Sequence, residues 1–141
     1  CMMYYLGSAK PLPIVSCTYS EGTIHTEEIA GERCVVRKHF SLENVLYVGS
    51  DHGCGCGIVH SPRGYEGPLY STGEETLIIK RRMESLWSLM KNHGAPPFVE
   101  FYGCWDCDQE HPPDDIVEID IDELLAEGFC FTERRFYCIK I

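Results

Sequence analysis

A single long helical segment, 74–92, stands among many short β-type runs, and this imbalance limits the folds open to the chain. The helix is predicted because its apolar residues recur at the spacing of one helical face; these are Ile79, Met83, Leu86 and Met90. Ser71 with Glu74 is typical of a capping box at the start, and Gly94 stands where a C-terminal cap is expected. The basic run 80–82 is expected to face solvent.

The remaining regular structure is predicted as short strands. Runs of β-branched, aromatic and other apolar residues occur at 2–6, 23–29, 45–48, 57–60, 98–102 and 116–121, and two adjacent valines favour a further strand over 34–40. The segments 129–131 and 136–141 predict a terminal hairpin. About six strands and one long helix predict an α+β fold with a mixed or antiparallel sheet and the helix packed on one face. We expect a single domain over 1–141.

The charge balance argues against several partners. The chain has 22 acidic and 12 basic side chains and a formal net charge of −10, so the phosphate backbone of a nucleic acid would repel it. The sequence has no stretch of about 18 apolar residues that would predict a membrane span. It also has no basic segment followed by an apolar one that would predict secretion, so we expect a soluble, cytoplasmic protein. The stretch 104–133 contains no lysine or arginine, which leaves docking on a basic protein partner as an alternative.

Nine cysteines are the least usual part of the composition. An odd number excludes a complete set of disulfides within one chain, and two pairs have the one- and two-residue gaps of metal or redox sites. Cys1 is expected to be a terminal thiol without function, the alternative being an N-terminal nucleophile. The single cysteines among apolar residues are expected to be small buried side chains; they are Cys17, Cys34, Cys130 and Cys138.

The two cysteine pairs each follow a predicted strand. Cys54 and Cys56 alternate with three glycines over 53–57, where glycine allows close backbone approach. Cys104 and Cys107 leave a two-residue gap, which lets both sulfurs bind one ion. Because four thiolates suit tetrahedral Zn²⁺, we predict a zinc site made of these four cysteines. Three histidines are reserve ligands: His52, His60 and His111.

The order of the strands decides whether the two pairs can meet. If 45–48 and 98–102 are parallel neighbours joined through the helix, their carboxyl ends lie at the same edge of the sheet and both cysteine loops meet there. If 57–60 instead folds back as a hairpin partner, Cys104 emerges at the edge opposite Cys54 and a shared metal is impossible. The residue pattern is compatible with both arrangements.

A thiol-redox role is the alternative for the second pair. Residues 99–107 resemble the active-site strand and Cys-x-x-Cys pair of the protein disulfide isomerase and thioredoxin family. In that family the first cysteine comes later and opens a helix, whose N-terminus lowers the pKa of its thiol. Here Cys104 comes two residues after Tyr102, and His111 with two prolines follows in place of a helix. Cys104 therefore lacks that activation.

The chain also resembles a group of small uncharacterised bacterial proteins that carry a Gly-Cys-Gly-Cys-Gly segment. The likeness rests on residues 4–8, 36–40, 47–50 and 53–57, and it implies no activity. No Ser/His/Asp elbow, Walker motif or dinucleotide fingerprint is present, which favours a non-enzymatic role. The sequence thus predicts a small zinc-binding protein. The alternatives are a thiol-redox protein using Cys104 and Cys107, and a non-enzymatic acidic interaction protein.

Overall fold

The computed structural model describes residues 1–64 and 73–141. One mixed sheet contains six strands in the order β2 (Ile24–Glu27), β3 (Asn44–Ser50), β1 (Met2–Ser8), β5 (Phe98–Trp105), β8 (Arg135–Lys140) and β6 (Asp115–Asp120). All neighbouring strands in this sheet are antiparallel except β8 and β6, which are parallel. A second, two-stranded sheet pairs β4 (His60–Ser61) with β7 (Phe131–Thr132). The predicted α+β fold is confirmed.

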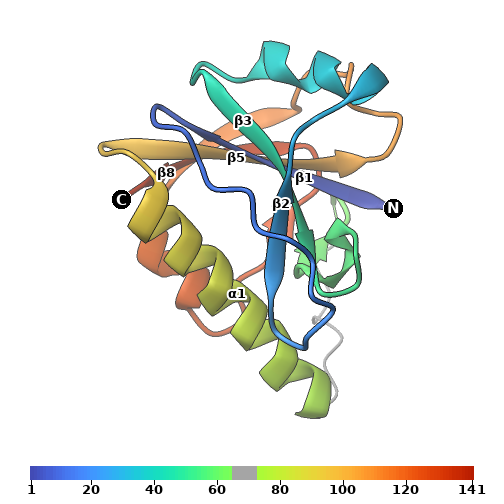
Figure 1. The fold of residues 1–141 in the computed structure, drawn as a ribbon, viewed down its shortest axis with the longest axis vertical. Helices are drawn as coiled ribbons and strands as arrows, with labels where there is room; N and C mark the ends of the chain where they lie inside the picture. The colour runs from blue at the N-terminus through green and yellow to red at the C-terminus, as the bar shows by residue number, and fades with distance from the viewer. Residues whose placement is uncertain (65–72) are drawn as a thin grey trace.

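Strand β1 is buried along its whole length because both faces of the sheet are covered. Tyr4 and Leu6 belong to the core on the face where helix α1 (Gly73–His93) packs. Met3 and Tyr5 belong to a second core on the opposite face. Figure 1 shows α1 on one side of the sheet and the segment 31–39 on the other. Two-sided burial explains why β1 is a continuous apolar run instead of an alternating one.

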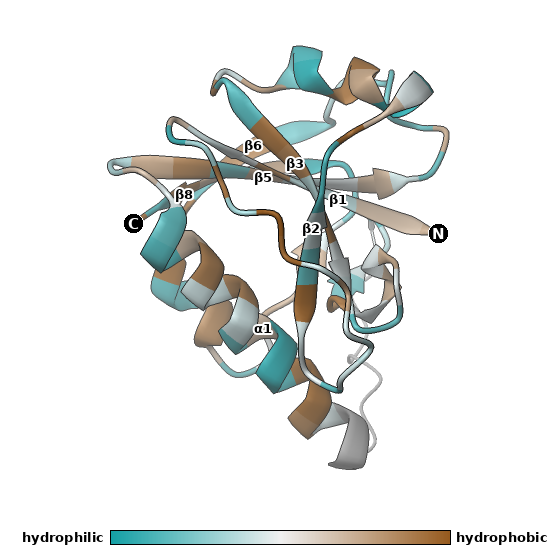
Figure 2. Cartoon of the chain, in the orientation of Figure 1, coloured by the Kyte–Doolittle hydropathy of each residue, from teal (hydrophilic) through white to brown (hydrophobic). Residues whose placement is uncertain are grey.

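Helix α1 packs through the predicted face. Met83, Leu86 and Met90 are buried in the first core, and each contributes roughly 1.5–3 kcal/mol by leaving water. Ile79 is half-buried. Hydrophobic and hydrophilic positions alternate along the helix, as an amphipathic pattern requires (Figure 2). The predicted cap at Ser71 lies outside the described residues.

The predicted strand over 34–40 is wrong, because this segment belongs to a 3-10 helix, η1 (Gly31–His39). Val36 points into the second core and is fully buried, whereas Glu32, Arg33 and Lys38 are exposed. One inward apolar residue among outward charged ones satisfies the packing without a strand. The preference of valine for β-structure is therefore overridden by the tertiary contact.

The predicted terminal hairpin is also wrong. Strand β7 pairs in parallel with β4, and β8 inserts between β5 and β6 in the large sheet. Arg134, with a φ of 57°, lies in the turn between β7 and β8. The last strand thus closes the core by pairing with β5, which is far away in sequence, and not with the segment just before it.

The topology brings several chain segments to one end of the sheet. Strands β3 and β5 are each antiparallel to β1, so they run in the same direction and end at the same side. They are not direct neighbours, as one of the two arrangements compatible with the sequence required, because β1 lies between them and separates them by roughly 10 Å, or two strand spacings. Cys1 directly precedes β1 and so lies at this end too. In the described part of the chain, no helix has the length and apolar character needed to cross a membrane.

Candidate metal centre

Three cysteines meet at this end of the sheet. The sulfur atoms of Cys1, Cys54 and Cys56 all lie within 4.8 Å of one another. Cys1 comes from the start of β1, whereas Cys54 and Cys56 come from the turn that follows β3 and contains the short 3-10 helix η2 (Gly55–Gly57). Soft thiolates at this separation are the donors that zinc, copper(I) and iron–sulfur clusters use, so the group could hold a metal ion.

The last residue of β3 fixes the turn that carries two of these sulfurs. The backbone N–H and the hydroxyl of Ser50 both donate to the carbonyl oxygen of Cys54, each at 2.7 Å. The Gly53 N–H donates back to the Ser50 carbonyl at 3.0 Å. Gly53 has a φ of 85°, in the left-handed region that favours glycine. These bonds therefore close the turn at Cys54, the first of its two cysteines.

Close contact between this turn and β1 brings the third sulfur to the other two. A Cβ added at Gly55 would lie 2.5 Å from the carbonyl oxygen of Met2, so only glycine lets the turn approach β1 this closely. The Met2 N–H in turn faces the Cys56 sulfur at 3.4 Å, with the sulfur as acceptor. Hydrogen-bond donors placed in this way are typical around sulfur atoms that bind metals.

A buried ion pair anchors the turn to helix α1. The Arg82 guanidinium donates to the Asp51 carboxylate at 2.6 Å and 3.0 Å and to the Gly57 carbonyl at 3.0 Å. The second carboxylate oxygen of Asp51 accepts the Gly22 N–H at 2.6 Å. Both charged side chains are less than a tenth exposed. Arg82 thus holds both ends of the segment 51–57, contrary to the predicted exposure of the whole 80–82 run.

Burial decides the protonation of the half-buried ligand. Desolvation raises the pKa of the Cys54 thiol, and the backbone N–H of Cys56 opposes that rise by hydrogen bonding to its sulfur. Cys1 and Cys56 are exposed. A metal that binds the group must therefore displace a proton from Cys54, so the affinity depends on pH.

The second predicted pair does not join this group. Strand β5 continues through Trp105, so Cys104 is a strand residue paired with Met3, and its side chain is buried in the second core. Burial, followed by the neighbouring Asp108 and Asp106, raises the pKa of Cys104 to about 12. A protonated, buried thiol is a poor metal ligand and a poor nucleophile.

Cys107 lies on the turn after β5 and is exposed, with a φ of 82°. Its backbone N–H donates to the side-chain oxygen of buried Gln109 at 2.8 Å. The thiol lines a groove of about 440 Å³ between this turn and η1, which Arg33 and Asp106 also line. The turn contacts the cysteine group through the backbone, where the Asp106 N–H donates to the Cys1 carbonyl at 2.9 Å.

The reserve histidines have other partners. The Nε2 atom of His52 lies 3.1 Å from an Arg82 nitrogen, so it accepts that N–H and its lone pair is used. The Nδ1 atom of His60 donates to the Ile58 carbonyl at 3.0 Å. His111 is exposed on the turn after β5. Among the residues that the structure describes, none of the three is part of the cysteine group.

Sequence reasoning missed Cys1 as a ligand. Its signal was present but indirect: a cysteine directly before the central strand is near the group only if that strand is antiparallel to the one leading into the turn. The remaining single cysteines were expected to be buried. Cys34 is exposed, which makes that expectation wrong there, and Cys17, Cys130 and Cys138 are half-buried. All nine cysteines lie in the described residues, and none forms a disulfide.

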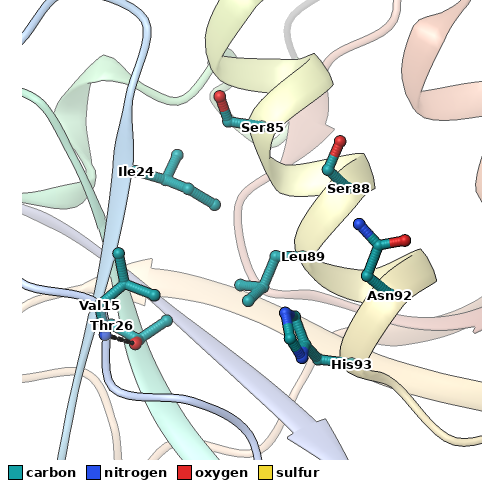
Figure 3. Close-up of a pocket in the computed structure, with 8 residues that line it drawn as sticks. All are labelled: Val15, Ile24, Thr26, Ser85, Ser88, Leu89, Asn92 and His93. Atoms are coloured by element: carbon teal, nitrogen blue, oxygen red, sulfur yellow. Dashed lines mark hydrogen bonds between the residues drawn. The ribbon is translucent and has the colours of Figure 1, made fainter.

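A separate cavity of about 190 Å³ lies between α1 and β2, and no cysteine lines it. Leu89 of the helix points across it toward Val15 and Ile24, while Ser88 and Asn92 border it along the helix (Figure 3). This volume is below the roughly 300–1,000 Å³ of most small-molecule sites. The cavity therefore gives weaker evidence for a ligand than the cysteine group does.

Part of the acidic stretch is neutralised inside the chain. Asp106 pairs with Arg33, and Asp115 pairs with both Arg63 and Arg135. These two guanidinium groups hold the pKa of the Asp115 carboxyl well below its usual range. The pairing reduces the charge that a basic partner would meet, and docking on such a partner stays a prediction. Comparisons with protein families, curated proteins and solved structures gave no match to this chain.

Proposed function

We propose that this chain is a small metal-binding protein that holds a zinc ion on Cys1, Cys54 and Cys56. The observation that carries the proposal is the mutual distance of at most 4.8 Å among the three sulfurs. Zinc–sulfur bonds of about 2.3 Å place two sulfurs of a tetrahedral site roughly 3.8 Å apart. The observed spacing therefore requires only a small contraction on binding.

The surroundings support metal binding over incidental proximity. Two of the ligands lie on one turn that is closed by Ser50 and anchored by Arg82, so binding orders few additional groups. The Met2 N–H faces the Cys56 sulfur, as hydrogen-bond donors do around metal-bound thiolates. We propose zinc over the other metals that bind thiolates because it accepts thiolate ligands and needs no redox partner.

The proposal is tested by metal content and by binding. Protein purified without chelator is expected to carry about one zinc per chain by elemental analysis, and chelator is expected to lower its melting temperature. The double change Cys54→Ser with Cys56→Ser should abolish zinc binding. The matched double change Cys104→Ser with Cys107→Ser should leave the zinc content unchanged.

The two double variants separate the possible sites. Loss of zinc from both would show that the second pair contributes as well, as the sequence alone predicts. Zinc-free wild-type protein that also fails to bind added zinc would refute the proposal. Circular dichroism of each variant checks that a lost metal does not merely reflect an unfolded chain.

A further inference from the structure

The three-sulfur group occupies one side of a metal only. Cys54 is half-buried at the base of the turn, and Cys1 and Cys56 are exposed at its outer edge. Three thiolates fill three of the four positions of a tetrahedral ion. Among the described residues, the group contains no fourth histidine, cysteine, aspartate or glutamate. Because Cys1 and Cys56 are exposed, an outside ligand can reach the group from solvent.

We propose that this fourth position binds a small external thiol as the fourth ligand of the metal. The inference rests on the proposed function, since it requires a metal on the three cysteines. Zinc sites with four protein ligands are closed, whereas sites with three keep a position for an outside ligand. An ion that already has three soft thiolate ligands favours a fourth soft donor.

Binding of the external thiol needs no oxidant. The external thiol gives its proton to solvent as its sulfur bonds to the metal, and the oxidation states of the metal and of all sulfurs stay the same.

The charge of the site indicates which kind of thiol it would bind. The chain carries a formal net charge of −10, and three bound thiolates bring the ion itself to a net negative charge, so a cationic thiol is favoured over an anionic one.

Cobalt(II) loaded onto the chain gives a direct readout, because thiolate-to-cobalt charge-transfer absorption grows with the number of bound thiolates. Adding cysteamine, a cationic monothiol, should raise that absorption by about one third as the count goes from three to four. Cobalt should remain with the protein after gel filtration. Ethanolamine has the same charge without the sulfur and should leave the spectrum unchanged.

The possible results separate the metal site from its open position. If cobalt does not bind to the wild-type chain, the metal site itself is refuted. If cobalt binds but cysteamine leaves the spectrum unchanged, or strips the metal from the chain, the site stands and the open position is refuted. The Cys34→Ser variant, which removes an exposed cysteine outside the group, should respond as the wild type does. A lost response there would show that cysteamine acts elsewhere.

Discussion

The segments 51–57 and 104–107 look alike in the sequence but differ in the structure. In the sequence each follows a predicted strand and carries two closely spaced cysteines, and in the structure the two strands end at the same side of the sheet. In the first segment β3 stops at Ser50, and the turn brings both sulfurs to a third one. In the second, β5 runs on past Cys104, which buries one sulfur and leaves Cys107 exposed on a turn.

This difference shows that cysteine spacing alone does not define a site. The place where the strand ends decides whether two sulfurs point the same way, and glycine decides whether the turn can approach its neighbour. The two segments also differ in their anchors. Arg82 and Asp51 form a buried pair beside the first, whereas Arg33 and Asp106 form an exposed pair beside the second.

The largest expected effect comes from the buried anchor. Arg82→Met leaves the Asp51 carboxylate buried without its partner, which should destabilise the metal-free protein by roughly 3–5 kcal/mol. Urea unfolding measures this change directly. The same variant should also bind zinc more weakly, because Arg82 holds the Gly57 carbonyl at the end of the turn. A loss below about 1 kcal/mol, the size expected for an exposed pair, would contradict the buried-anchor assignment.

Gly55→Ala tests the close approach to β1. The added Cβ would crowd the Met2 carbonyl oxygen, so the turn must move away from β1. Its two sulfurs then lie farther from the sulfur of Cys1. Overpacking of this kind costs about 1–3 kcal/mol, and we expect zinc affinity to fall about tenfold or more. The matched control is Gly94→Ala, whose Cβ would also crowd a backbone carbonyl oxygen, that of Met90 in α1, with Val99 and Ile141 as its next neighbours. If both variants bind zinc equally well, the turn position does not govern the site.

The fold was largely predictable because hydrophobic spacing is set locally. The helix follows from its apolar face, and β1 follows from its continuous apolar run. The η1 segment was not predictable in the same way, since its two valines fit a strand and only contact with the second core selects a helix. The partner of β8 depends on residues far away in the chain, which spacing does not reveal.

Two of the three cysteines in the group could be predicted from the sequence in the same way. Glycines around Cys54 and Cys56 mark an unusual backbone, which is a local signal. Cys1 joins them only through the antiparallel pairing of β1 with β3, and Arg82 anchors them only through tertiary packing. Both facts depend on strand order, the point on which the sequence was compatible with two arrangements.

The pH dependence of metal binding follows from Cys54. Because burial raises the pKa of its thiol, the metal displaces a proton, and affinity should fall as the pH falls, by about tenfold per pH unit for each proton released. In the metal-free protein the raised pKa makes folding depend on pH in the opposite direction. The stability that it contributes is present below about pH 8.5, the usual pKa of a cysteine, and is lost as the pH rises through the raised value. The gain in melting temperature on adding zinc should therefore grow from about pH 6 to about pH 8. A gain that is constant over this range would show that no proton is displaced.

The smallest expected effect comes from the exposed anchor. The Arg33 hydrogen bond lowers the pKa of the Asp106 carboxyl, but the two side chains are 48% and 35% exposed, so water and salt screen the pair. Arg33→Met should cost less than about 1 kcal/mol and leave zinc binding unchanged. Since the pKa of Asp106 is lowered, this small contribution is present above about pH 4 and is lost as the pH falls further. Urea unfolding at low and high salt checks it, and the cost should shrink at high salt. A loss as large as that of Arg82→Met would mean that the turn at Cys107 is anchored as firmly as the turn at Cys54, and the contrast between the two segments would then rest on strand length alone.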